Sequence, residues 1–335
     1  RPGGRAAEPT PAHMATSRLT PMLRHYLEVK AAHPDCILIY RMGDFYELFF
    51  DDAVEAAPIL EVALTARHKG SANETPMCGV PHHAVESYIA KLIEAGYRVA
   101  VCDQVEDPAE AKGLVRREVT RIVTPGTLSD PLLLDGDERS LLVALEWTPS
   151  GGAGALLEVS TGDFEVTRWA SPEEALEDLR LLEPREVLLT DDERLAPVRA
   201  WSERRGVCVT ELAEGQRLAR PEARRVLADH FGVGTLRGFG LAEDEPAVRA
   251  AAHALAYALE TQGATLSHVR ELRVREPGRG LILDATTLAN LEVFRNARDG
   301  SRRATLLSVV DDTKTAAGSR RLRAWLREPL ADAEA

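Results

Sequence analysis

The sequence predicts an α/β protein of more than one domain, on three observations. A length of 335 residues exceeds what one small core organises, and two or three domains are expected. Hydrophobic residues make up 44% of the chain and charged residues 28%, as in ordinary folded proteins. Segments with helical periodicity alternate with short apolar runs of strand length, and the pattern becomes helical towards the end.

The first unit is expected to alternate helices with strands. Its first helix begins at Thr20-Pro21, where threonine caps the helix and proline suits the first helical position, and it stops before Pro34. The elements expected after it are strands at 36–42 and 45–49 joined by a Gly43-Asp44 turn, a helix at 51–64, a polar loop at 68–76, a helix at 84–95, and strands at 97–105 and 117–127.

The second unit follows a break at 129–138 and is expected to contain a mixed sheet. Three strands at hairpin spacing precede a helix that begins at Ser171-Pro172, and a further strand follows that helix. The expected elements are strands at 139–147, 152–161 and 163–169, a helix at 171–184, a strand at 186–190, a long helix at 245–263, and helical segments at 281–294 and 305–330.

These breaks divide the chain into four parts: a flexible tail at 1–18, a first domain at 19–132, a second at 133–263, and the start of a helical domain at 264–335. The chain begins with Arg, and Met14 is the expected true start. It has no signal sequence and no apolar run near the ~20 residues of a membrane helix, so a cytoplasmic location is expected.

The bulk charge limits how this chain can meet nucleic acid. The net charge is −12, and residues 19–132 hold 11 Lys or Arg against 17 Asp or Glu. Binding of DNA by the whole surface is therefore disfavoured, and any contact must be local. One local candidate is the stretch 112–121, which contains four cations and one acid; it suits either a phosphate contact or a solvated surface.

Most catalytic and metal-binding signatures are missing from this sequence. The four cysteines are widely scattered and are expected to be reduced thiols rather than zinc ligands. The glycine-rich stretch 150–155 is expected to be a hairpin loop, because it lacks the lysine of a phosphate loop. Glu158 and Asp163, on or beside neighbouring strands, leave open a metal-dependent nuclease as an alternative function.

The stretch "RMGDFYELFF" (41–50) gathers aromatic residues in a chain that has few of them. If 45–49 is a strand, Phe45 and Glu47 point to one face, and Tyr46, Leu48 and Phe50 point to the other. A ring and a carboxylate together just after a turn are unusual for a plain amphipathic strand. Taken alone, the pattern still favours an ordinary core phenylalanine over a ring that contacts a partner.

The sequence resembles the MutS family of DNA mismatch repair proteins from about residue 14 to the end. The runs that carry the resemblance to the family's first domain are "TPMLRHYLEVKAAHPDCILIYRMGDFYELFFDDA", "TPMCGVPHHAVESYIAKLIEAGYRVAVCDQVEDP" and "RIVTPGTLSD". "DFEVTRW" and "GFG" resemble the connector domain, and "LDATTLANLEVFRN" and "TLLSVVDDTKTAAGSRRLRAWLREPL" the start of the core and lever domain. The resemblance implies a mixed α/β mismatch-binding domain, a ribonuclease-H-like α/β connector, and the start of an all-α core/lever domain.

The resemblance also implies roles for individual residues. Phe45 would insert at a mispaired base from the minor groove, and Glu47 would hydrogen-bond the displaced base. The weaker candidates for contacts with the DNA backbone or groove are Asp44, Arg67, Lys69, Pro76, Met77 and Lys112.

The longer parent protein that the resemblance implies is a weak ATPase that uses ATP and Mg²⁺. It forms a homodimer, binds mismatched double-stranded DNA and works with MutL-type repair proteins at the nucleoid. No phosphate loop occurs in this sequence, so we expect the chain itself to be a binding module without catalytic residues, cofactor or metal. A module that only docks other proteins through the connector is a second alternative.

Overall fold

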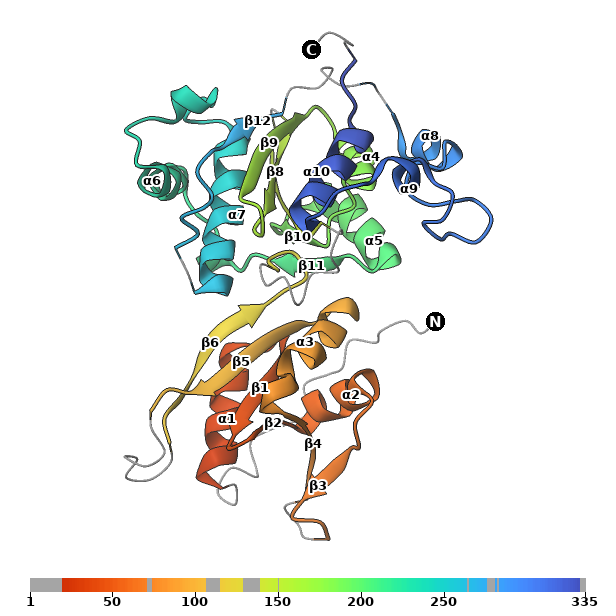
Figure 1. Cartoon of the computed structure of the whole chain (residues 1–335). Helices are drawn as coiled ribbons and strands as arrows, with labels where there is room; N and C mark the ends of the chain where they lie inside the picture. Colours follow the sequence, from red (N-terminus) through yellow and green to blue (C-terminus); the bar gives the residue numbers. More distant parts are fainter. Residues whose placement is uncertain are drawn as a thin grey trace. The chain divides into compact units, whose positions relative to one another are not determined.

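The computed structural model describes residues 20–70, 74–106, 115–128, 139–149, 151–263, 265–275, 281 and 283–331. The predicted tail, with Met14, and the predicted break at 129–138 lie outside these residues. Among the helices described, none is long and apolar enough to cross a membrane. The chain divides into two compact units, one up to Ile122 and one from Val123 onward (Figure 1).

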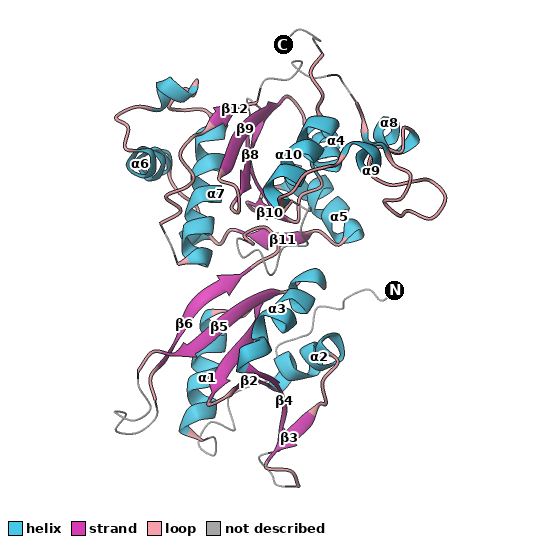
Figure 2. Cartoon of the chain, viewed as in Figure 1, coloured by secondary structure: helices cyan, strands magenta, loops and turns pink. Residues whose placement is uncertain are grey.

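In its described residues, the first unit combines one mixed sheet with the helices α1, α2 and α3 (Figure 2). Its sheet has the strand order β3-β4-β2-β1-β5-β6, in which β2 is antiparallel to both β1 and β4 and β5 is parallel to β1. The elements are α1 (Pro21–Ala32), β1 (Cys36–Met42), β2 (Phe45–Phe49), α2 (Phe50–Leu60), β3 (Thr65–Arg67), β4 (Thr75–Pro81), the 3₁₀ helix η2 (His82–Ala84), α3 (Val85–Glu94), β5 (Arg98–Gln104) and β6 (Arg117–Val123).

A buried carboxylate ties the first helix to the sheet. Asp52, at the start of α2, accepts hydrogen bonds from the Tyr26 hydroxyl (3.0 Å) and the Leu38 amide (3.0 Å). The Lys30 ammonium lies 2.7 Å from the same carboxylate. These contacts join α1, β1 and α2, and because a buried charge is costly unless it is paired, they fix where the three elements meet.

The predicted polar loop at 68–76 is partly wrong. The helix predicted at 51–64 ends at Leu60, where Glu61 adopts a left-handed conformation (φ 57°), and β3 and β4 follow it. β4 contains two prolines and a glycine, and these residues hid the strand from sequence reasoning, since proline removes a backbone donor and is uncommon inside sheets. The other predicted elements of this unit are confirmed to within a few residues at their ends.

The second unit contains a mixed sheet, as predicted, and this sheet has six strands in the order β11-β10-β7-β8-β9-β12. The hairpin-connected strands β7, β8 and β9 are antiparallel, whereas β10 runs parallel to β7 and β11 parallel to β10. The strands and helices are β7 (Leu141–Thr148), β8 (Gly151–Glu158), β9 (Asp163–Trp169), α4 (Pro172–Leu182), β10 (Glu186–Leu189), α5 (Ala196–Arg205), β11 (Cys208–Glu211), α6 (Arg220–Phe231), α7 (Pro246–Gln262), β12 (Arg273–Val274), α8 (Ala285–Asn290), α9 (Leu306–Val310) and α10 (Ala316–Arg327).

Two predictions for the end of the chain need adjustment. The helical segments expected at 281–294 and 305–330 are the shorter helices α8, α9 and α10, with turns between α8 and α9. Before them, β12 pairs in parallel with β9, so the sheet extends past residue 263. The helices α5 and α6 and the strand β11 were not predicted, because the charge-rich sequences of the two helices show no clear apolar stripe.

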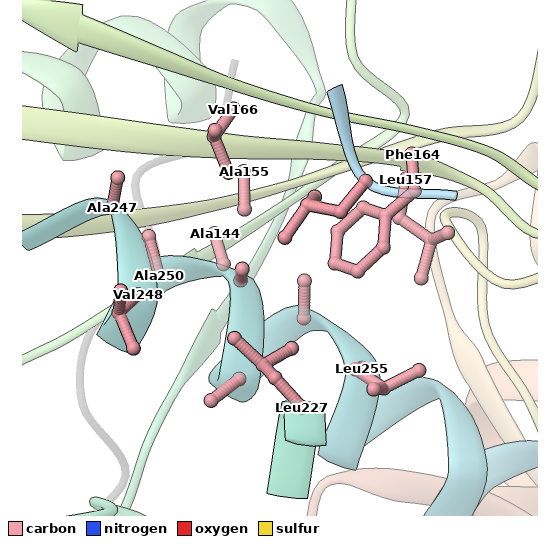
Figure 3. Packing of buried hydrophobic residues seen from close by; sticks show 14 of the residues in the cluster. Ala144, Ala155, Leu157, Phe164, Val166, Leu227, Ala247, Val248, Ala250 and Leu255 are labelled. Atoms are coloured by element: carbon pink, nitrogen blue, oxygen red, sulfur yellow. The ribbon is translucent and has the colours of Figure 1, made fainter. Parts of the chain in front are cut away.

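The core of the second unit depends on small side chains. Alanines on α7, including Ala247 and Ala250, lie towards the sheet residues Ala144 and Ala155, and Leu227 of α6 packs on the side of α7 away from the sheet (Figure 3). Small residues on both surfaces let the helix approach the sheet closely, and the larger side chains then close the gaps.

The stretch 150–155, predicted as a hairpin loop, does connect two antiparallel strands, β7 and β8, but the loop is shorter than predicted. Residues from Gly151 onward belong to β8, whose pairing with β7 begins at Thr148 and Gly151, so Gly152 and Gly154 lie in the strand predicted at 152–161. The Trp147 ring occupies the side-chain position of Gly152, and the Trp169 ring that of Gly154; a Cβ at either glycine would lie 2.1 Å from its ring. The glycines therefore make room for two tryptophans.

We expect Gly154→Ala to lower the free energy of unfolding by about 1–3 kcal/mol, because the added methyl group overpacks against the Trp169 ring. Denaturant unfolding of the 335-residue chain measures this. Gly234→Ala is the control, since a Cβ there meets nothing within 4 Å, and it should leave stability unchanged or slightly higher. Equal stability of the two variants would contradict the packing argument.

Candidate functional site

The strand β2 presents one aromatic ring to solvent and buries its neighbours. It follows the predicted two-residue turn, in which Gly43 is left-handed (φ 60°) and Met42 pairs with Phe45. The Phe45 side chain is 49% exposed, whereas Tyr46 and Leu48 are buried. The division of this strand into an outer face with Phe45 and Glu47 and an inner face with Tyr46 and Leu48 is confirmed.

The assignment of Phe50 to the inner face of the strand is wrong. The strand ends at Phe49, and Phe50 begins α2 with a positive φ of 56°, so strand alternation does not reach it. Phe49 shares the face of Phe45 but is fully buried, because the Tyr26 ring of α1 packs against it at 5.1 Å between centroids. One face of β2 is thus covered at the Phe49 end and open at the Phe45 end.

The inner face of the strand is anchored by Tyr46. Its hydroxyl donates a hydrogen bond to Asp103 on β5 (2.9 Å), and the Arg41 guanidinium lies 5.3 Å from the centre of its ring. Burial raises the pKa of Tyr46 to about 12, so the hydroxyl remains a donor at all physiological pH values. This contact holds the register that turns Phe45 outward.

The Glu47 carboxylate lies half-buried on the same face as Phe45. Its Oε2 is 3.5 Å from Nη1 of Arg67 and accepts no hydrogen bond from the described residues. Burial raises the pKa of Glu47, and the positive charge of Arg67 opposes this increase. The residue of β4 that pairs with Glu47 is Gly79, which has no side chain to cover the carboxylate. A buried acceptor that lacks a donor is uncommon in folded proteins and can accept one from a ligand.

The other predicted contact residues differ in their exposure and in the strand or turn that carries them. Arg67 ends β3 and meets Glu47, an approach that sequence reasoning missed because it did not predict β3. Asp44 is exposed in the turn, and Lys69 is exposed just after β3. Pro76 and Met77 are half-buried on β4, where Met77 pairs with Phe49. Lys112 lies outside the described residues.

The basic stretch at 112–121 is largely engaged within the protein. Arg116 pairs with Glu118, and Arg121 pairs with Glu86. Arg117 is buried, and its guanidinium lies 5.3 Å from the centre of the Tyr40 ring. Of the two readings left open for this stretch, these contacts favour charges that offset neighbouring acids.

A metal-dependent nuclease, the alternative function, would use the carboxylates of Glu158 and Asp163. These two residues do lie together, but one of them has basic partners. Glu158 and Asp163 are paired across the β8–β9 hairpin. Glu158 is 2% exposed, and its oxygens lie 2.8 Å from Arg139 and 3.1 Å from Arg320. Metal binding by Glu158 would require the loss of these ion pairs. In the part of the chain that the structure describes, no three His, Cys, Asp or Glu side chains gather at metal-binding distance.

The fold and this site define a multidomain α/β protein whose candidate site is an exposed ring beside a half-buried carboxylate. Comparison with known families is more specific. Residues 20–131 match MutS domain I, residues 140–270 match MutS domain II, and residues 286–335 match MutS domain III.

Relatives give the same result. The chain is 46% identical to the DNA mismatch repair protein MutS of Myxococcus xanthus, over 93% of this chain and 35% of that protein. It is also 46% identical to the protein of the same name from Symbiobacterium thermophilum, over 95% of this chain and 37% of that protein. The chain belongs to the MutS family, and it spans little more than a third of the length of these relatives.

We expect Arg67→Met to raise the pKa of Glu47 further, because the attraction that favours the carboxylate is lost. An NMR titration of the labelled glutamate carboxyl carbons measures this pKa. Arg121→Met, which removes a cation paired with Glu86, should leave the pKa of Glu47 unchanged. An unchanged value in Arg67→Met would show that the two charges do not interact in solution.

Folding raises the pKa of Glu47, so the folded state holds this proton more tightly than the unfolded state does. Protonated Glu47 therefore adds to the free energy of unfolding at low pH, and this contribution is lost as the pH rises through the folded-state pKa.

Proposed function

We propose that this chain is the mismatch-recognising part of a DNA mismatch repair protein. Phe45 inserts at a mispaired or unpaired base from the minor groove, and Glu47 hydrogen-bonds the displaced base. The observation that carries the proposal is the shared outer face of β2, where a 49% exposed phenylalanine stands beside a half-buried carboxylate whose Oε2 accepts no hydrogen bond from the described residues. The relatives of this chain are DNA mismatch repair proteins of the MutS type, which supports the proposal.

The energetics of duplex DNA explain how a ring on a rigid strand would discriminate. An apolar wedge kinks the duplex and costs a few kcal/mol of unstacking at one base step. A mismatch or an unpaired base lowers this cost, so the deformation energy itself separates damaged from sound pairing. Phe45 suits such a wedge because its neighbours Tyr46 and Leu48 are buried and hold the backbone in place.

Glu47 adds a second level of discrimination. A carboxylate near phosphates is repelled, and a complex in which it finds no base donor is penalised. Its partial burial makes the penalty larger, since the pKa of Glu47 is already raised by loss of solvent. Arg67 offsets the carboxylate in the free protein, and the same cation can turn to a phosphate when DNA is bound.

The remaining contacts are proposed from position alone. The exposed Lys69 follows Arg67 after β3, and Pro76 and Met77 lie on the neighbouring β4, so these residues can line the groove beside Phe45. Asp44 lies in the turn that precedes the ring. Lys112 keeps its proposed phosphate contact only on the basis of the family resemblance.

The properties of the longer protein are proposals at the level of the family. We infer that the whole protein uses ATP and Mg²⁺, forms a homodimer, cooperates with MutL-type proteins and acts in the cytoplasm at the nucleoid. The connector is proposed to be ribonuclease-H-like, with the helices from α8 onward as the start of an all-α core. The described chain itself is proposed to bind DNA without catalysis.

We expect Phe45→Ala in the full-length protein to abolish the preference for a G·T or single-base-loop duplex over perfectly paired DNA. The wedge that lowers the cost of the kinked complex is lost, while the buried side of β2 is unchanged. Fluorescence anisotropy titrations with the mismatched duplex and with the perfectly paired duplex give the two affinities, and their ratio measures the preference.

Leu64→Ala is the matched control for this measurement, since Leu64 in the same unit is also 49% exposed and should leave the preference intact. A Phe45→Ala protein that melts normally and keeps its mismatch preference would refute the wedge assignment.

We expect Glu47→Ala to tighten binding to perfectly paired DNA, because a repulsive charge is removed and Arg67 is released towards the phosphates. Glu47→Gln removes the charge but keeps a hydrogen-bonding group, so it should tighten this binding as well while retaining more of the mismatch contact. Both affinities come from anisotropy titrations. Weaker or equal binding of perfectly paired DNA by both variants would count against the electrostatic role.

A further inference from the structure

The second unit contains a cavity of about 760 Å³ that plays no part in the proposed mismatch site. Its walls come from the C-terminal ends of α4 and α5, from α8 and the turns after it, and from α10, and Figure 1 shows these helices on one side of the unit. Nine arginines line it, from positions far apart in the sequence: Arg139, Arg180, Arg185, Arg204, Arg205, Arg295, Arg302, Arg323 and Arg327.

The positive charge of this cavity is not balanced from within its lining. Among the described residues that line it, Glu183 is the one acidic side chain, and its carboxylate lies 2.8 Å from the Arg327 guanidinium. Burial lowers the pKa of Arg327, Glu183 opposes this, and the neighbouring Arg139 and Arg323 lower it further by repulsion. Such a concentration of like charge is unusual in a chain whose net charge is −12.

Helix ends explain only part of the cluster. Arg180 stands in the last turn of α4, and Arg204 and Arg205 end α5, where cations interact favourably with the helix dipole. Arg295 follows α8 and has no such role. Arg323 and Arg327 lie four residues apart on α10, a spacing at which like charges on a helix repel. The cluster therefore concentrates more positive charge than helix ends explain, and a bound anion would relieve the repulsion within it.

Several of these guanidinium groups are available to a ligand. Arg180, Arg204, Arg205 and Arg295 are exposed, and within the described ranges none of them has an ion-pair partner. Guanidinium groups bind phosphate oxygens in pairs of parallel hydrogen bonds, which makes arginine clusters suited to phosphate groups. The volume falls within the ~300–1,000 Å³ typical of small-molecule sites.

We propose that this cavity is a binding site for a phosphate-rich anion of about nucleotide size. The group that the arginines would recognise is a row of two or more phosphates. A nucleoside triphosphate and a short single-stranded nucleic acid both supply such a row. Arg205 belongs to α5 and Arg295 to the turns after α8, so two separate elements supply cations to the ligand, and the remaining arginines of the lining add to the positive potential.

The test is isothermal titration calorimetry of the 335-residue chain with tripolyphosphate in about 0.15 M salt, where contacts with scattered surface charges are screened. One saturable site per chain is expected. Arg205→Gln/Arg295→Gln should weaken this binding at least tenfold. Arg220→Gln/Arg225→Gln, which removes two exposed arginines of α6 outside the cavity lining, should leave it unchanged. Thermal melts of the variants without ligand check that both remain folded.

Further titrations identify the source of the phosphates. Tighter binding of ATP than of tripolyphosphate assigns a nucleotide, and tighter binding of a nine-nucleotide single strand assigns nucleic acid; both results uphold the phosphate site. Three results overturn it: no saturable binding of tripolyphosphate, equal weakening by both double variants, or equally tight binding of a hexaglutamate peptide, which would assign an acidic protein segment. Neither set of variants touches β2, so the result is independent of the proposed mismatch site.

Discussion

The candidate mismatch site depends on the pairing of β2 between β1 and β4. Because both edges of this short strand are hydrogen-bonded, its five residues cannot rotate or slip by one position without turning every side chain to the wrong face. That constraint places Phe45 outside and Tyr46 inside. The exposure of one ring is therefore a consequence of how the rest of the strand is buried, and not of a mobile surface loop.

Anchors on each face of the sheet make this constraint rigid. On the inner face, Tyr46 bonds to Asp103, and on the outer face Tyr26 packs against Phe49. Asp52, through its contacts with α1 and β1, holds Tyr26 in place. In the proposed complex, a ring wedged into a stacked duplex would transmit force to its backbone, and a strand fixed in this way would lose little binding energy to its own deformation.

Local sequence patterns predicted the parts of this site that depend on local rules. The Gly43-Asp44 turn and the alternation of Phe45, Tyr46 and Glu47 follow from the period of a strand and from glycine's access to positive φ. Three kinds of feature escaped prediction. β4 was hidden by its prolines, the place of Phe50 depends on its unusual φ at the start of α2, and the approach of Arg67 to Glu47 arises only when β3 and β4 bring distant segments together.

The distribution of charge shows why bulk composition is a poor guide to what this chain binds. A net charge of −12 disfavours DNA over the whole surface, yet the structure gathers nine arginines around one cavity of the second unit and sets one arginine against the carboxylate of β2. Coulomb interactions fall off within about 8 Å at physiological salt, so a ligand responds to these local groups rather than to the total. An acidic protein can therefore offer focal positive sites and reject polyanions elsewhere, and both proposed sites gain selectivity from this contrast.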